Sequence, residues 1–107
     1  MTVQTQTVGR LQSLLDLYLD GYQSRVVDQT LSKLISLEVG QCRAELQRLA
    51  ARLTTYERQY GMTSREFYQR FRSGELGDAI DFVEWSAFWD MHQATQSRLD
   101  NLVKQVP

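Results

Sequence analysis

Three carboxylates lie close together in the sequence, at Asp78, Asp81 and Glu84. Carboxylate oxygens together with several waters are the ligands that Mg²⁺ takes in proteins, so this spacing could serve a small metal-dependent enzyme. Asp81 and Glu84 also stand at the two positions whose side chains cap the start of a helix, where the helix dipole favours acidic groups. We therefore favour capping, expect no metal or other cofactor, and keep the metal-dependent enzyme as an alternative.

The side chains that could act as nucleophile or base are few. His92 is the only histidine and Cys42 the only cysteine, and a nucleophile needs a base within hydrogen-bond reach that a third group orients. Asp90 is two positions from His92 and would face another side of a helix. The loop containing Gly74 and Gly77 lacks the lysine of a phosphate-binding loop. We predict that the protein is not an enzyme.

Seven of the ten arginines fall in the middle of the chain and could form a basic track for DNA. Glutamates are interspersed among them, and the whole chain has 12 basic and 13 acidic side chains, a net charge of −1. A dedicated nucleic-acid binder usually has a basic excess, so a solvated helix face is the favoured interpretation and a DNA-binding autoregulator is an alternative. The seven are Arg43, Arg48, Arg52, Arg58, Arg65, Arg70 and Arg72.

An apolar stripe with coiled-coil spacing runs through the centre of the sequence. Its steps alternate between three and four residues, which keeps one face of a helix towards a partner helix. The stripe predicts a helix over residues 28–60, roughly 50 Å long. Such a helix needs other helices or a second copy along it, so we predict a homodimer that associates through this seam. The seam residues are Val39, Cys42, Leu46, Leu49, Leu53, Tyr56 and Tyr60.

Local signals predict three further helices. The first covers residues 8–19 and stops at Gly21, and because Leu17 and Leu19 fall off its main stripe, this helix is sandwiched or takes part in an interface. Residues 22–27, which contain β-branched side chains, are expected to form an extended connector. A short corner helix follows Thr63 and ends at Gly74.

Two capping motifs mark the last two helix starts. Thr63 and Glu66 fit a capping box, and Met62 and Phe67 occupy the positions of its hydrophobic staple. Asp81 and Glu84 form the second, with Ile80 and Trp85 as staple, and predict a C-terminal helix over residues 82–103. No strand pattern persists. The fold class is all-α in a single domain, residues 1–107: a long coiled-coil-like central helix packs with the C-terminal and corner helices, and the N-terminal helix lies alongside.

Residues 26–85 resemble a group of small helical prokaryotic proteins, frequent in cyanobacteria and archaea and regarded as antitoxin-like partners of small toxins encoded nearby. The resemblance implies a subunit that binds and neutralises a partner protein. It also implies that the partner contacts the exposed loop and the aromatic start of the last helix, at Glu75, Leu76, Asp78, Trp85 and Trp89. The resembling segments are Val26–Leu31, Lys33–Ile35, Tyr60–Thr63, Glu66-Phe67, Phe71, Gly74–Asp78, Asp81-Phe82 and Glu84-Trp85.

The function predicted from the sequence is therefore a non-enzymatic helical protein–protein interaction module, antitoxin-like in role. The chain lacks a run of apolar residues long enough for a membrane span and lacks a basic start followed by an apolar segment. We expect no membrane partner and a cytoplasmic location. The single cysteine cannot form an intrachain disulfide, so the fold does not depend on oxidation.

Overall fold

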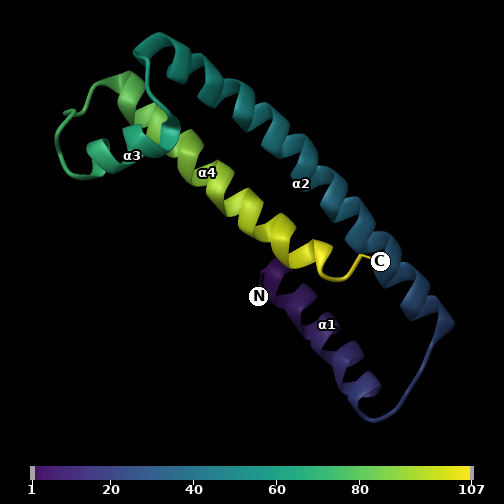
Figure 1. Ribbon diagram of the computed structural model, residues 1–107. Helices are drawn as coiled ribbons and strands as arrows, with labels where there is room; N and C mark the ends of the chain where they lie inside the picture. Colours follow the sequence, from purple (N-terminus) through teal and green to yellow (C-terminus); the bar gives the residue numbers. More distant parts are fainter. Residues whose placement is uncertain (1, 107) are drawn as a thin grey trace. The chain divides into compact units, whose positions relative to one another are not determined.

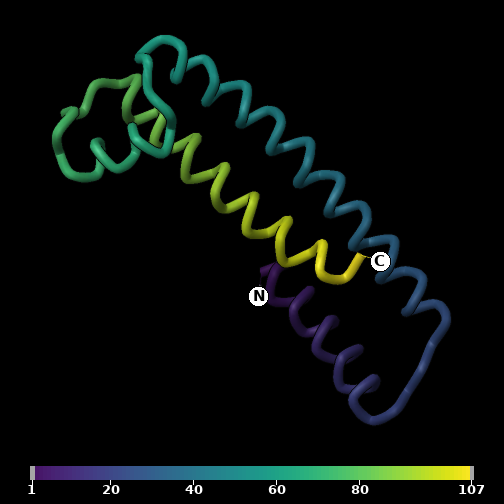
Figure 2. Tube along the Cα trace, viewed as in Figure 1, coloured from purple at the N-terminus to yellow at the C-terminus, as the bar shows by residue number. Residues whose placement is uncertain are grey.

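The computed structural model describes residues 2–106, and its ordered elements are helices. They are α1 (Val3–Leu19), α2 (Arg25–Tyr60), α3 (Ser64–Arg72) and α4 (Ile80–Val103). Helices account for 82% of the described chain, which contains no strand, and the long α2 packs against α4 and α3. The all-α prediction is confirmed. Figure 2 shows α4 running back beside α2 in the opposite direction.

The helices group into two compact units, one ending at Leu34 and the other beginning at Ile35. The N-terminal unit contains α1 and the first turns of α2. The C-terminal unit contains the rest of α2 with α3 and α4 (Figure 1). Helix α2 is continuous through both units, and the single domain expected from the sequence stays a prediction.

The core of the C-terminal unit is aromatic and is built by three helices. Leu53 of α2, Phe67 of α3 and Trp85 of α4 are buried together. The rings of Phe67 and Trp85 stack with centroids 3.8 Å apart and planes 4° from parallel. The indole Nε1–H of Trp85 donates to the hydroxyl of Ser64 at 2.9 Å, so the one polar atom of this large side chain is satisfied inside the core.

The seam predicted on α2 is covered by α4 of the same chain. Val39, Cys42, Leu49 and Leu53 are buried, and the other three positions are half-buried. The ring of Tyr56 stacks on Trp85, with centroids 5.6 Å apart. The helix that the stripe requires is thus supplied within the C-terminal unit, and self-association along this stripe stays a prediction.

The first two helices begin earlier than the sequence predicted. Helix α1 starts at Val3 rather than at residue 8, because the hydroxyl of Thr2 accepts the backbone N–H of Thr5 and caps it. Helix α2 starts at Arg25, and the hydroxyl of Ser24 accepts the N–H of Val27. The extended connector expected over residues 22–27 is therefore wrong for its second half, where a serine cap overrides the β-branched side chains.

One half of the capping box predicted for α3 is confirmed, the N-cap at Thr63, whereas within residues 2–106 no hydrogen bond returns from the Glu66 carboxylate to Thr63. The hydroxyl of Thr63 accepts the N–H of Glu66 at 3.1 Å, and Met62 packs against the same core cluster as Phe67. The helix ends before Gly74, whose φ of +83° is accessible to glycine at little cost.

The second predicted cap is wrong. Helix α4 starts at Ile80, and the N-cap residue, Ala79, provides no side-chain hydrogen bond. The carboxylate of Asp81 instead accepts the hydroxyl of Tyr60 at 2.6 Å. The expected staple also fails, because Ile80 is 76% exposed whereas Trp85 is fully buried. A tyrosine from α2 engages the carboxylate that the local pattern assigned to capping.

Candidate functional site

The residues that the sequence proposed for partner contact are divided between core and surface. Trp85 is fully buried and belongs to the core, which corrects its assignment to a contact surface. Leu76 and Trp89 are half-buried and pack against the core cluster. Only Glu75 and Asp78 are exposed. Of the five predicted contact residues, a partner would therefore meet the carboxylates of Glu75 and Asp78 rather than the two indoles.

Glu75 is also engaged within the chain. Its carboxylate forms an ion pair with the guanidinium of Arg70, across the turn that ends α3. This hydrogen bond raises the pKa of Arg70. The pair is solvent-exposed, so it orients the turn more than it stabilises the fold.

The acidic residues that suggested a metal site accept hydrogen bonds from tyrosines. The hydroxyl of Tyr56 donates to Glu84 at 2.8 Å, and Tyr60 donates to Asp81. Burial, followed by the hydrogen bond to Glu84, raises the pKa of Tyr56 to about 12. Within residues 2–106 no group of three or more Asp, Glu, His or Cys side chains could hold a metal ion, so Asp78 does not complete a site with the other two.

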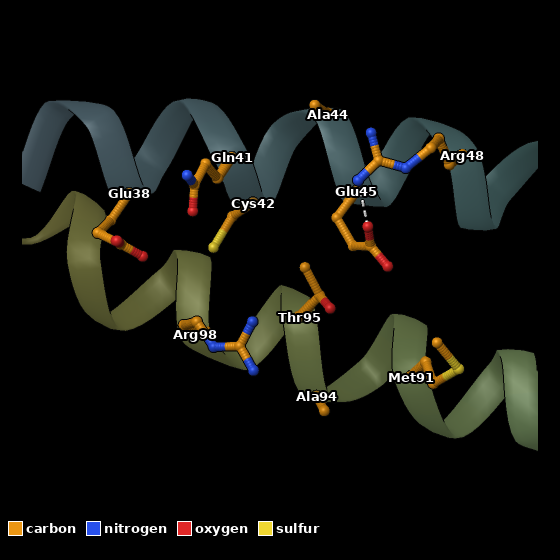
Figure 3. Close-up of a pocket in the computed structure, with 10 residues that line it drawn as sticks. All are labelled: Glu38, Gln41, Cys42, Ala44, Glu45, Arg48, Met91, Ala94, Thr95 and Arg98. Atoms are coloured by element: carbon orange, nitrogen blue, oxygen red, sulfur yellow. Dashed lines mark hydrogen bonds and ion pairs between the residues drawn. The ribbon is translucent and has the colours of Figure 1, made fainter. Parts of the chain in front are cut away.

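An open groove of about 560 Å³ lies between α2 and α4. Figure 3 shows the side chains of Cys42 and Thr95 pointing between the two helices, and Arg48 paired with Glu45 along α2. The ten lining residues include two acidic and two basic side chains, so the groove has no charge preference. His92 is not among them, so no imidazole faces the thiol of Cys42 in this groove.

His92 itself is half-buried on α4. Its ring lies parallel to that of Trp89, with centroids 6.1 Å apart. Its Nδ1 is buried without a hydrogen-bond partner in the described chain. No acid orients the imidazole, so the arrangement does not match a catalytic histidine.

Four of the seven arginines of the predicted basic track contact side chains of their own chain. Arg48 and Arg70 form ion pairs with glutamates. The guanidinium of Arg52 lies 5.7 Å from the ring centre of Phe88, and that of Arg72 lies 6.0 Å from the ring centre of Tyr68. Intrachain contacts of this kind favour a solvated, structural role for these side chains over nucleic-acid binding.

Most of the exposed large hydrophobic residues lie in the N-terminal unit, where α1 and the first turns of α2 form a helical hairpin. Two hollows of about 180 and 250 Å³ lie between the two helices. Apart from Thr30, their walls are apolar, and we call this surface the hairpin face. Its residues are Leu11, Leu14, Leu15, Tyr18, Val26, Val27, Leu31 and Leu34.

Polar contacts close one end of the hairpin. The hydroxyl of Tyr18 lies 2.6 Å from the carboxylate of Asp28 and accepts the backbone N–H of Ser24 at 3.0 Å. The hydrogen bond to Asp28 raises the pKa of Tyr18. Gly21 turns the chain with a φ of +96°, and the rings of Tyr18 and Tyr22 meet edge to face. These contacts fix the turn and leave the apolar face open.

No residue of α1 is buried. Leu11 is 52% exposed, Leu15 51% and Val26 73%. These three residues were not among the site residues predicted from the sequence. The apolar positions on more than one side of α1 did indicate that this helix is sandwiched or takes part in an interface. What the sequence could not indicate is that α2 would leave so much of this helix uncovered.

Among the helices of residues 2–106, none is both long and apolar enough to cross a membrane. Comparison with protein-family models, curated proteins and solved structures gives no match. The function is therefore argued from the surfaces described above, among which the hairpin face is apolar and exposed.

Proposed function

We propose that the protein is a non-enzymatic helical interaction module that packs against helices of another chain through the hairpin face. The observation that carries the proposal is α1, a helix of 17 residues without a buried side chain. The N-terminal unit ends at Leu34, and units below about 40 residues usually need oligomerisation, disulfides or metals. A partner that covers the hairpin face would provide the missing apolar contacts.

The energy available from this face supports reversible association. Five of its side chains are exposed, and fully burying one contributes about 1.5–3 kcal/mol. Because each already hides part of its surface, covering the remainder contributes about 4–8 kcal/mol per chain. Two such faces together contribute about 8–16 kcal/mol. Association costs about 4–15 kcal/mol, so the gain and the cost are of similar size, and binding through this face is reversible. The exposed five are Leu11, Leu15, Val26, Leu31 and Leu34.

The specific role that we propose is antitoxin-like, in the cytoplasm, with a partner protein encoded nearby. Its support is the resemblance of residues 26–85 to that group of helical proteins. The polar turn with Glu75 and Asp78, exposed at the α3–α4 end of the C-terminal unit, is the surface that this role assigns to the partner. Co-expression should restore the growth of cells that produce the neighbouring gene's product, and unchanged growth would contradict the antitoxin-like role.

Light scattering on the full chain tests the interaction module. We expect a particle heavier than one 12.5 kDa chain, either for the protein alone or after mixing with the neighbouring gene's product. Leu11→Asp should remove the association that the hairpin face mediates, because it places a carboxylate on the apolar face, and should leave binding at Glu75 and Asp78 unchanged.

Ser13→Asp is the matched control, since Ser13 is on the opposite side of α1 and receives the same charge. A monomer that ignores its neighbour, or two variants that behave alike, would contradict the proposal.

A further inference from the structure

The groove between α2 and α4 has charges of opposite sign on its two walls, at the same end. On α2, Glu38 lies four positions before Cys42, one helical turn away. On α4, Arg98 lies three positions after Thr95, again one turn away. Because the two helices run in opposite directions, both steps lead towards the same end of the groove (Figures 2 and 3). A carboxylate and a guanidinium therefore stand on facing walls there.

Neither of these two charges is neutralised by another side chain of the described residues. Within residues 2–106 no ion pair includes Glu38 or Arg98, and both side chains are exposed. The other two charged side chains of the groove, Glu45 and Arg48, pair with each other. A ligand at the Glu38 end thus meets one negative and one positive group that its own charges can engage.

The floor of the groove offers a further polar group. Thr95 is 5% exposed, and its hydroxyl forms no hydrogen bond within residues 2–106, whereas the hydroxyl of Thr55 donates to the carbonyl of Ala51 one turn earlier. In that range the one fully buried side-chain atom without a partner is Nδ1 of His92, so the hydroxyl oxygen of Thr95 is not sealed in the core. Because Thr95 lines the groove, this hydroxyl can donate to or accept from a molecule bound there.

The groove becomes more apolar away from the two unpaired charges. Met91, one turn before Thr95 on α4, is 47% exposed, and Ala44 and Ala94 contribute methyl groups to the lining. The volume of about 560 Å³ is within the range of small-molecule sites. The arrangement suits an occupant with both of its charges at one end and an apolar group at the other.

From these positions we infer that the groove binds a small zwitterion with an apolar side chain, an α-amino acid in chemical class. Its carboxylate binds the guanidinium of Arg98, its ammonium binds the carboxylate of Glu38, and its side chain lies towards Met91. An α-amino acid carries both charged groups on one carbon, which matches opposite charges on facing walls. The inference goes beyond the proposed function, because the groove belongs to the C-terminal unit and the hairpin face to the N-terminal unit.

Nuclear magnetic resonance titration of the full chain with L-leucine tests the inference. We expect saturable shifts of the backbone amide signals around Cys42 and Thr95, with a Kd of about 0.1–5 mM, because exposed ion pairs each contribute little. N-acetyl-L-leucine lacks the ammonium and L-leucinamide lacks the carboxylate, so each should bind at least about threefold more weakly. No shifts at up to about 20 mM L-leucine, or equal binding of either derivative, would overturn the inference.

Charge-removing variants test the two walls separately. Glu38→Gln and Arg98→Gln should each weaken the binding of L-leucine at least about threefold, because each removes one charged partner. Arg43→Gln on α2 and Asp100→Asn on α4 are the matched controls, since both positions are exposed and lie outside the groove lining. The controls should bind L-leucine as the unchanged chain does, and groove and control variants that behave alike would contradict the inference. Circular dichroism of each variant checks that its helices are retained.

A variant of the hairpin face separates this inference from the proposed function. Leu11→Asp should leave the binding of L-leucine unchanged, because Leu11 lies in the other unit. Shifts confined to residues 8–34 would place the ligand on the hairpin and contradict the inference, whatever the association measured by light scattering.

Discussion

Trp85 shows how one polar atom is accommodated in an aromatic core. Its indole donates to the hydroxyl of Ser64, which is itself buried. The backbone N–H of Ser64 is satisfied in turn by the carboxylate of Glu57 at 2.8 Å. These two hydrogen bonds connect α2, α3 and α4 at the place where their apolar side chains meet.

Ser64→Ala should destabilise the protein by about 1–3 kcal/mol, because it leaves the buried indole N–H without an acceptor. Urea unfolding followed by tryptophan fluorescence measures the change. Ser97→Ala, at an exposed position on α4, should stay within about 0.5 kcal/mol of the unchanged chain. Equal effects of the two substitutions would show that the Ser64 hydrogen bond contributes nothing.

Tyr56 should make stability depend on alkaline pH. Its pKa rises from 10.0 to about 12 in the folded chain, through burial and the hydrogen bond to Glu84. A raised folded-state pKa contributes stability that is complete below pH 10 and is lost as pH rises towards 12. The free energy of unfolding should fall across this interval, and Tyr56→Phe should reduce the fall.

Urea unfolding at several alkaline pH values measures how steeply the free energy of unfolding falls with pH in the unchanged chain and in Tyr56→Phe. Tyr22→Phe is the control, because no hydrogen bond involves the Tyr22 hydroxyl within residues 2–106. A Tyr56→Phe slope equal to that of the unchanged chain would contradict the assignment.

At the scale of the element, α2 contains Gly40 at a position where neither the backbone conformation nor the packing requires a glycine. A Cβ added at Gly40 would meet nothing within 4 Å, and the residue lies in the middle of the helix. Gly61, directly after the helix, has a φ of +67°. An L side chain therefore fits the helical backbone at Gly40, whereas it would be strained by the positive φ at Gly61.

Gly40→Ala should stabilise the protein by about 0.5–1 kcal/mol, because alanine restricts the unfolded chain and is the better helix former. Gly61→Ala should destabilise it by about 1–2 kcal/mol, because an L side chain is strained in the left-handed region. Thermal unfolding followed by circular dichroism distinguishes the two. Changes of the same sign would mean that the glycine conformations do not determine these effects.

At the scale of the whole molecule, burial is confined to one of the two units. Every buried side chain among residues 2–106 lies at Val39 or later in the sequence. The C-terminal unit therefore has a core of its own, whereas the N-terminal unit has an apolar face without a covering layer.

A chain that begins at Ile35 should keep cooperative unfolding and lose the association that the hairpin face mediates, because it retains the core and lacks the hairpin face. Circular dichroism and sedimentation equilibrium measure the two properties. Non-cooperative melting of the shortened chain would show that the C-terminal unit needs residues 2–34 to fold. A dimer of the shortened chain would place self-association on another surface.

The proposed antitoxin-like role also belongs to this scale, since it assigns the partner to the C-terminal unit, whereas the exposed apolar face lies in the N-terminal unit. The polar turn with Glu75 and Asp78 and the hairpin face lie in different units. Substitutions on one should therefore leave binding at the other unchanged.

The sequence by itself determined the helices, the 3-4 stripe on α2, the Thr63 cap and the ends at Tyr60 and Gly74. Each of these depends on residues within a few positions of one another, whose periodicity and backbone preferences act locally. Only the tertiary structure decided that α4 covers the stripe and that Tyr60 takes the carboxylate of Asp81, 21 positions away. It also decided that the face of α1 stays open. Such outcomes depend on which distant side chains meet, and local spacing does not specify those contacts.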